Sequence, residues 1–326
     1  ILSIFIKNSY NMHLLSKIGL VAIAVFICGL FIQAIQSPMS ANNTQETSAT
    51  KEQPAPQILR VEAIDIPNVM TFAGERVPLQ DTDVRERLDR EIHVNTYWHS
   101  NMLLMIKKAN RFFSEIEPLL KKYNLPDDFK YLAVAESGLD NVTSHAGASG
   151  FWQFMKATGK EYGLEINNYV DERYNLELAT KVAAQYLINS KELFGSWTNA
   201  AAAYNAGNAG ITKQMKRQDA TDYYSLLLNS ETGRYVFRIL AFKEILSNPE
   251  KYGFYVDQQD LYQAIPTKTI VVNTPVADFA KFAKQQGINY KILKIHNPWL
   301  RDTYLKNASG KAYSIKIPKP GYYVLE

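Results

Sequence analysis

Helical periodicity constrains the fold of this chain more than any other feature of its sequence. After residue 100, apolar side chains recur mainly at three- and four-residue steps, at Leu103, Ile106, Phe113, Ile116 and Leu120. This spacing places apolar side chains on one face of an α-helix. Similar stretches, separated by glycine and asparagine turns, occupy residues 178–194, 197–204 and 235–246. Strand-like alternation is scarce before residue 265, so the sequence predicts a central domain that is mainly α-helical.

Capping and breaking residues indicate where these helices begin and end. Thr82 is a candidate N-cap for the first helix, and Pro118 is expected to kink or restart the second. The segment LPDDFKYLAVAESGLD, residues 125–140, has a proline suited to the first turn of a helix and a glycine, Gly138, suited to its end. One short helix is therefore predicted to end at Ser137.

A glutamate lies on the apolar side of that short helix. Glu136 follows Phe129, Leu132 and Ala133 at helical spacing, so its carboxyl is predicted to face the buried side. A carboxyl removed from water has a raised pKa, stays protonated near neutral pH and can donate a proton to a leaving group. The alternative interpretation is a structural glutamate that pairs with an arginine or lysine elsewhere in the chain.

Three segments rich in glycine and aromatic residues follow this glutamate. They are SHAGASGFWQFMKATG at residues 144–159, AAAYNAGNAGI at 201–211 and ETGRYVFRILAFKEIL at 231–246. Sugar rings offer apolar C–H faces and hydroxyl edges, which suit aromatic side chains that lie beside amides and hydroxyls. Each segment alone is compatible with core packing, but the three together and in this order favour a sugar-binding site.

Composition excludes several kinds of site. A single cysteine, Cys28, rules out an intrachain disulfide and a thiolate-rich zinc or iron–sulfur site. The five histidines contain no HExxH motif or other close pair, so we expect no metal. The net charge of +4 is too small to indicate nucleic-acid binding.

The N-terminal part predicts export. The segment from Ile18 to Ile35 carries no charge. Lys7 and Lys17 precede it, and a polar stretch at residues 37–57 follows it. This pattern is typical of an export signal or a short membrane anchor followed by a flexible tether. A buried core helix is the alternative interpretation.

The C-terminal part differs from the rest in charge and pattern. Residues 261–326 hold 10 Lys and Arg against 3 Asp and Glu, an excess of +7. From residue 265 the pattern predicts strand, helix, helix and strand, with Asn297 and Pro298 closing the second helix. We therefore expect a signal peptide or anchor at 1–36, a flexible linker at 37–60, a helical domain at 61–258 and a small α+β module at 265–326.

The ordered motifs resemble a known family. Glu136-Ser137, the run GASGFWQFM, the run AYNAG and the run ETGRYV are similar to the motifs of the soluble-lytic-transglycosylase family over roughly residues 75–255. The runs GFWQFMKATGKEYGL and VDERYN resemble in particular the membrane-bound lytic murein transglycosylase D type. The resemblance implies a goose-type, lysozyme-like helical catalytic domain at 61–258, followed by the small α+β module.

The resemblance also implies roles for individual residues. Glu136 is implied to be the sole general acid and base. The residues implied to bind substrate are Ser144, Gln153, Met155, Tyr204 and Asn205. Those implied to support the site are Glu231, Tyr235 and Ser137. Tyr204 matches the tyrosine that positions the catalytic carboxyl or the sugar, and Glu231 matches a buried polar residue.

The implied reaction needs only one carboxyl. Ordinary glycosidases use two carboxylates, and the only nearby candidate, Asp140, lies beyond the break at Gly138. The resemblance implies a peptidoglycan lytic transglycosylase, which cleaves the MurNAc–GlcNAc β-1,4 bond and forms 1,6-anhydro-MurNAc ends in cell-wall turnover or remodelling. Two alternatives stay open: a goose-type lysozyme-like muramidase that hydrolyses this bond, and a catalytically decayed peptidoglycan-binding scaffold.

The resemblance sets expectations for partners and location as well. The expected partners are peptidoglycan glycan strands, and the membrane through the N-terminal segment if it is uncleaved; neither cofactor nor nucleic acid is expected, and the chain is expected to be a monomer. The expected location is the periplasm of a Gram-negative-type bacterium, at the inner or outer membrane. The module at 265–326 resembles a degenerate LysM-type peptidoglycan-binding module without the usual Gly-Asp-Thr start. The alternative is a family-specific appendage that packs on the catalytic domain.

Overall fold

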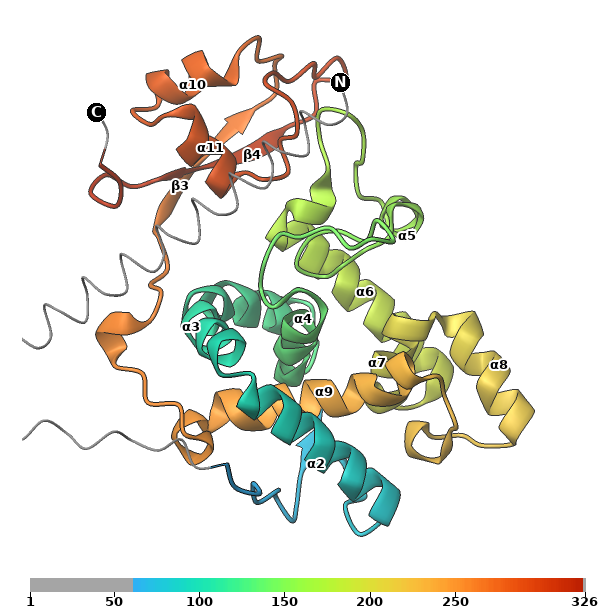
Figure 1. The fold of residues 1–326 in the computed structure, drawn as a ribbon. Helices are drawn as coiled ribbons and strands as arrows, with labels where there is room; N and C mark the ends of the chain where they lie inside the picture. Colours follow the sequence, from blue (N-terminus) through green and yellow to red (C-terminus); the bar gives the residue numbers. More distant parts are fainter. Residues whose placement is uncertain (1–60, 325–326) are drawn as a thin grey trace, which may run out of the picture. The chain divides into compact units, whose positions relative to one another are not determined.

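The computed structural model describes residues 61–324 of the chain. The signal peptide or anchor expected at 1–36 and the linker expected at 37–60 lie outside the described residues. Within 61–324, no helix is both long and apolar enough to span a membrane. The fold is mainly α-helical with a small strand-and-helix module at the C-terminal end, as the sequence predicts (Figure 1).

The described part opens with a short hairpin and two helices. Strands β1 (Thr71–Phe72) and β2 (Glu75–Arg76) pair in antiparallel fashion and precede α2 (Thr82–Tyr97) and α3 (His99–Lys122). The N-cap of α2 is Asp81, whose side chain accepts a hydrogen bond from the backbone of Val84. The prediction of Thr82 as the cap is wrong by one residue, because the carboxylate before it already satisfies the free N–H groups of the first turn. Pro118 lies inside α3 and does not restart it.

The predicted short helix is present. A 3₁₀ turn, η1 (Asp127–Phe129), leads into α4 (Lys130–Ser137), and Gly138 follows with a φ of 60°. This left-handed conformation costs a glycine little and ends the helix, as the sequence predicts.

The other helices of the domain enclose a single core. They are α5 (Lys156–Glu161), η2 (Glu172–Tyr174), α6 (Leu176–Phe194), α7 (Trp197–Ala206), α8 (Asn208–Gln218), η3 (Tyr223–Ser225), α9 (Ser230–Ser247), η4 (Pro249–Tyr252) and η5 (Gln258–Asp260). Four consecutive alanines of α7, residues 200–203, are fully buried. Their small side chains let α7 pack against both α6 and α9, and α9 in turn packs against α2 and α4 (Figure 1). The hairpin residue Phe72 and the α2 residue Leu88 belong to the same core as Phe129.

The C-terminal module has the predicted order of strand, helix, helix and strand. It consists of β3 (Thr267–Val272), α10 (Phe279–Gln285), α11 (Tyr290–His296) and β4 (Tyr313–Pro318). The two strands are antiparallel, with Ile270 opposite Ile315. Ile315 belongs to a second apolar cluster with Phe279 and Leu293, and the partly buried Ile270 packs against that cluster. Asn297, fully buried, is the C-cap of α11, as predicted.

The module packs on the loop that precedes α6. Val170 and Tyr174 of that loop belong to the apolar cluster of the module, and the backbone N–H of Asp171 donates to the carbonyl of Trp299 at 2.9 Å. Lys311 adds ion pairs to Glu165 at 2.8 Å and Glu172 at 2.6 Å. The packing that the appendage interpretation predicts is therefore present in the structure.

Candidate active site

Glu136 lies in the last turn of α4, next to α9. The residues before it, from Tyr131 to Val134, are buried in the core. From α9, the buried Tyr235 donates its hydroxyl hydrogen to Oε1 of Glu136. The packing of α4 against α9 thus joins two residues 99 positions apart in the sequence.

The environment of Glu136 favours its protonated form. Burial raises the pKa of Glu136 from 4.5 to about 7, and the negative charge of Glu231 acts in the same direction. The hydrogen bond from Tyr235 and the positive charge of Arg238 act against this rise in pKa. Within residues 61–324 no lysine or arginine forms an ion pair with Glu136, so the geometry does not support the alternative of a paired structural glutamate. A carboxyl with this pKa can both lose and regain a proton near neutral pH.

The raised pKa predicts a stability gain when the charge is removed. In the unfolded chain Glu136 ionises at about pH 4.5, whereas in the fold it holds its proton up to about pH 7. The contribution of Glu136 to the stability of the parent protein therefore falls as the pH rises from 4.5 to 7, and Glu136→Gln is expected to be more stable than the parent above pH 7 by about 3 kcal/mol, at about 1.4 kcal/mol per pH unit. Chemical denaturation of both proteins at pH 4 and pH 8 checks this. If the parent and Glu136→Gln have equal free energies of unfolding at pH 8 as well as at pH 4, the burial of Glu136 is contradicted.

Tyr204 and Asn205 lie in the last turns of α7. Burial raises the pKa of Tyr204 well above its ordinary value, with the charge of Glu136 acting in the same direction, and its hydroxyl donates to the carbonyl of Trp152 at 2.7 Å. Asn205 accepts from the hydroxyl of Thr232 at 2.8 Å and donates to Glu231 at 3.4 Å. Of the two tyrosines, Tyr235 is thus the one whose hydroxyl bonds to Glu136.

Glu231 differs from its expected environment. The family position is implied to be buried, but Glu231 is exposed in the first turn of α9. A carboxylate is favourable at this place because the helix N-terminus carries partial positive charge, so burial is not needed to hold it there. Its charge still acts on Glu136.

The other predicted substrate residues lie in the loop between α4 and α5. Gln153 donates from its amide to the carbonyls of Val142 at 3.0 Å and Gly150 at 2.8 Å. Ser144 accepts from the backbone of Ala148 at 3.1 Å, whereas Met155 is exposed. The polar contacts of Ser144 and Gln153 in the described chain thus hold the loop itself. Ser137 donates to the carbonyl of Ala133 at 3.1 Å, inside α4.

A buried arginine that the sequence reasoning did not single out fixes this loop. Arg173 pairs with Asp171 at 2.7 Å and donates to the carbonyls of Gly147 at 2.9 Å and Phe154 at 3.1 Å. At Gly150, where φ is +82°, an added Cβ would lie 2.0 Å from the carbonyl oxygen of Arg173. Only glycine fits there. The sequence pattern that could have revealed Arg173 is the charged pair Asp171 and Arg173, two residues apart in the run VDERYN.

A second cluster of charges that was not singled out joins α2 to α9. Glu91 of α2, 1% exposed, binds Arg234 of α9 at 2.6 Å and Arg90 at 2.5 Å, and it lies 3.9 Å from Arg238. Arg238 is therefore between the charges of Glu91 and Glu136. The sequence pattern that could have revealed Glu91 is the one that revealed Glu136. Glu91 lies at helical spacing from the buried apolar residues of α2.

No cluster suited to a metal ion is present in the described chain. Within residues 61–324, no three His, Cys, Asp or Glu side chains converge on a point that could hold a cation.

Comparison with known families identifies the domains. Residues 114–227 match the model of the transglycosylase SLT domain. The chain carries a transglycosylase SLT domain. Residues 268–321 match the model of the soluble lytic transglycosylase C-terminal LysM-like domain. Both resemblances read from the motifs are confirmed, and α2 and α9 extend the helical domain beyond the matched SLT residues.

Two curated relatives carry a transglycosylase name. The chain is 30% identical over 261 residues to "Membrane-bound lytic murein transglycosylase D" of Escherichia coli strain K12. The matched stretch covers 77% of this chain and 56% of that protein. The same values hold for the protein of that name from Escherichia coli O6:H1. A "Putative tributyltin chloride resistance protein" of Alteromonas sp. strain M-1 is 28% identical over 108 residues, covering 32% of this chain and 52% of that protein. The chain spans about half the length of the curated relatives it matches.

Proposed function

We propose that the protein is a peptidoglycan lytic transglycosylase. It cleaves the MurNAc–GlcNAc β-1,4 bond and forms 1,6-anhydro-MurNAc ends, in cell-wall turnover or remodelling. The observation that carries this proposal is a single carboxyl, Glu136, whose pKa of about 7 and hydrogen bond to Tyr235 suit proton transfer in both directions. The SLT domain and the two relatives named lytic murein transglycosylase D support the same chemistry.

One carboxyl accounts for the whole reaction. Glu136 donates its proton to the glycosidic oxygen while the bond from C1 of the muramic sugar breaks, and the acetamido group of that sugar stabilises the positive charge. The Glu136 carboxylate then takes the proton of the C6 hydroxyl as O6 bonds to C1. This closes the anhydro ring, restores the protonated carboxyl and needs neither water nor a cofactor.

Asp140, the carboxylate that follows Glu136 in the sequence, is not in position for ordinary hydrolysis. Asp140 is exposed and pairs with Lys108 of α3 at 2.5 Å. Retaining and inverting glycosidases place two carboxyl groups on either side of the scissile bond, and an ion-paired surface aspartate beyond Gly138 does not serve as that second group. This geometry favours the lyase over a goose-type muramidase.

The remaining residues of the site have proposed roles around this carboxyl. Tyr235 orients Glu136, with Glu231 and Ser137 supporting it from α9 and α4. Ser144, Gln153, Met155, Tyr204 and Asn205 bind the sugars. We assign residues 61–258 to the catalytic domain and 265–326 to a module that binds peptidoglycan. Export through residues 1–36 places the monomer in the periplasm at a membrane, tethered by residues 37–60.

Mass spectrometry of the products tests the proposed activity. Purified sacculi incubated with the protein are expected to yield muropeptides ending in 1,6-anhydro sugars. Ordinary reducing ends would replace the proposal by the muramidase, and the absence of cleavage by a folded protein would replace it by the decayed scaffold.

The cluster around Glu91 predicts a change in the pH profile. In Glu91→Gln a negative charge is lost and Arg238 is free to act more strongly on Glu136, so both effects lower the pKa of the general acid. The alkaline limb of kcat/KM is therefore expected to move to lower pH, since this limb follows loss of the acid's proton. A pH series on soluble glycan strands measures it.

Glu244→Gln is the matched control for that series. It also removes an ion pair from α9, with Lys251 at 2.8 Å, but it leaves the charges beside Glu136 in place. Its pH profile is expected to coincide with that of the parent protein. If both variants keep the parent profile, Glu91 has only a structural role.

A further inference from the structure

Three arginines gather around one buried carboxylate where α2 packs against α9 (Figure 1). Glu91 accepts two hydrogen bonds from Arg234, at 2.6 and 3.3 Å, and one from Arg90 at 2.5 Å. Arg238 lies 3.9 Å from the same carboxylate, which is beyond hydrogen-bond distance. The cluster therefore holds more positive charge than the neutralisation of Glu91 requires.

Arg238 is the surplus member of this cluster. A guanidinium carries five N–H donors in a planar fork. Within residues 61–324 none of the donors of Arg238 forms a hydrogen bond, and its side chain is 30% exposed. Without Arg238, Glu91 would still keep all of its hydrogen bonds, so the pairing of Glu91 does not account for this arginine. Arg238 is therefore available to a group from outside the chain.

Arg238 also lies beside the catalytic carboxyl. It follows Tyr235 by three residues on α9, so the two side chains are neighbours on the helix surface, about 4.5 Å apart along its axis. Tyr235 in turn donates to Glu136. The exposed Glu231 is the negative group at the start of the same helix, and together with Glu91 it still leaves the three arginines in excess by one charge. The site thus offers a positive group to an anion of the substrate.

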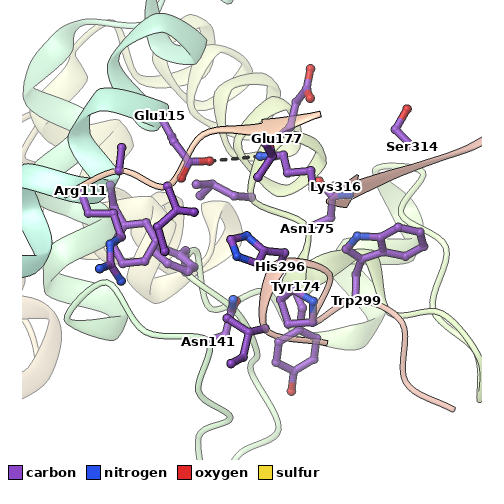
Figure 2. A pocket seen from close by; sticks show the side chains of 18 of the residues that line it. Arg111, Glu115, Asn141, Tyr174, Asn175, Glu177, His296, Trp299, Ser314 and Lys316 are labelled. Carbon is purple, nitrogen blue, oxygen red and sulfur yellow. Dashed lines mark hydrogen bonds and ion pairs between the residues drawn. The ribbon is translucent and has the colours of Figure 1, made fainter. Parts of the chain in front are cut away.

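This arginine cluster is distinct from the cavity beside the C-terminal module. That cavity has a volume of about 540 Å³, and Figure 2 shows the ion pair of Lys316 and Glu115 at it. Neither Glu136 nor any of the three arginines lines it. The positive group beside the catalytic carboxyl belongs to the helical domain alone.

A muramic sugar carries an anion close to the bond that breaks. Its stem peptide is attached through the lactyl ether at C3, in the same ring as the C1 at which the proposed cleavage occurs. The first two peptide residues, L-Ala and γ-linked D-Glu, span at most about 7 Å. The α-carboxylate of the D-Glu is free when the peptide is not amidated. This reach exceeds the step along α9 from Tyr235 to Arg238.

We propose that Arg238 binds the free α-carboxylate of the stem peptide and makes the enzyme select acidic stem peptides over amidated ones. The inference rests on the proposed function, which sets the place of the peptide. A guanidinium matches a carboxylate with two parallel N–H···O bonds, whereas a carboxamide offers one acceptor and no negative charge. Arg238 is thus a specificity-determining residue, and Arg234 and Arg90 neutralise Glu91 so that Arg238 keeps its charge for the substrate.

Two matched glycans test the proposal by binding. Each is a tetrasaccharide of alternating GlcNAc and MurNAc whose muramic sugars carry L-Ala-D-Glu with the γ-carboxyl capped as a methylamide. The two probes differ only in the α group, which is a carboxylate in one and a carboxamide in the other. Calorimetry in a Glu136→Gln background, where no bond is cleaved, is expected to give a Kd about tenfold lower for the acid. With Arg238→Gln added, the two Kd values are expected to agree within about twofold.

Arg85→Gln is the matched control in the same background. It removes an exposed arginine of α2 whose side chain forms no hydrogen bond or ion pair within residues 61–324. The control is expected to keep the full preference for the acid. If Arg85→Gln abolishes the preference as Arg238→Gln does, the effect is one of net charge and the assigned contact is wrong.

The remaining outcomes separate this proposal from a structural role and from the proposed activity. Equal binding of acid and amide before Arg238 is changed overturns the proposal without any arginine variant. If Arg238→Gln weakens both probes alike and the preference persists, Arg238 only supports the fold. Products of the wild-type enzyme are scored separately: ordinary reducing ends would replace the lyase by a muramidase, but the preference for the acid would stand, since a muramidase has the same peptide beside C1.

Discussion

Glu136→Gln is expected to abolish formation of anhydro sugars while the protein remains folded. The amide is nearly isosteric with the carboxyl and can still accept the hydrogen bond from Tyr235. It cannot donate a proton to the glycosidic oxygen and then take one from the C6 hydroxyl. Loss of general acid–base action costs about 10²- to 10⁴-fold in rate, and here one group performs both steps. Release of soluble muropeptides from sacculi, quantified over time, measures the loss.

Asp140→Asn is the control for that experiment. It removes the nearest other carboxylate of the α4 end, which is exposed and ion-paired in the structure. The variant is expected to keep most of the parent rate, with the same anhydro products. A variant Glu136→Gln that retained a tenth of the parent activity would exclude Glu136 as the catalyst, and an inactive Asp140→Asn would indicate a two-carboxylate mechanism.

Truncation after Tyr255 is expected to destabilise the helical domain. It uncovers Val170, which is fully buried, and Tyr174, and it leaves the buried Glu172 without its partner Lys311. Burial of a large apolar side chain contributes about 1.5–3 kcal/mol, so the two together amount to about 3–6 kcal/mol. The expected fall in melting temperature is roughly 10 °C, since each kcal/mol shifts a domain of this size by about 2–4 °C. Thermal unfolding followed by circular dichroism measures it.

Lys311→Ala separates the ion pairs from the apolar contact. Lys311 is partly exposed, so its pairs with Glu165 and Glu172 are screened by solvent and their loss is expected to lower the melting temperature by a few degrees at most. A truncated chain that melts cooperatively at the parent temperature would show instead that the module is independent of the domain. In that case its contacts with the loop before α6 would contribute nothing to stability.

The helical pattern of the sequence accounts for much of what the structure shows. Periodic apolar residues predicted the helical domain, and Pro126 and Gly138 predicted the limits of the short helix that carries Glu136. The change of pattern after residue 265 predicted the strand, helix, helix and strand of the module. These features depend on contacts between near neighbours in the chain, and capping residues and periodicity record such contacts directly.

The position of the glutamate on the apolar face also follows from spacing alone. Seven-, four- and three-residue steps from Phe129, Leu132 and Ala133 place Glu136 toward the core, and its pKa of about 7 agrees with that placement. The same rule applied to α2 would have found Glu91. Spacing along one helix shows which side a carboxyl faces, but it does not show what the carboxyl meets there.

Only the tertiary structure decided the partners. Tyr235 rather than Tyr204 bonds to Glu136, since the packing of α9 on α4 sets which hydroxyl reaches the carboxyl across 99 residues of sequence. Glu231 is exposed because it lies at the free N-terminus of α9. Arg173 holds the loop of Gly147 and Phe154, although it lies some 20 residues after them in the sequence. The cavity at the module likewise joins α3 to β4, through the pair Glu115 and Lys316. Local pattern fixes the helices and the faces they bury, whereas contacts between distant segments depend on how those faces pack, which no local pattern contains.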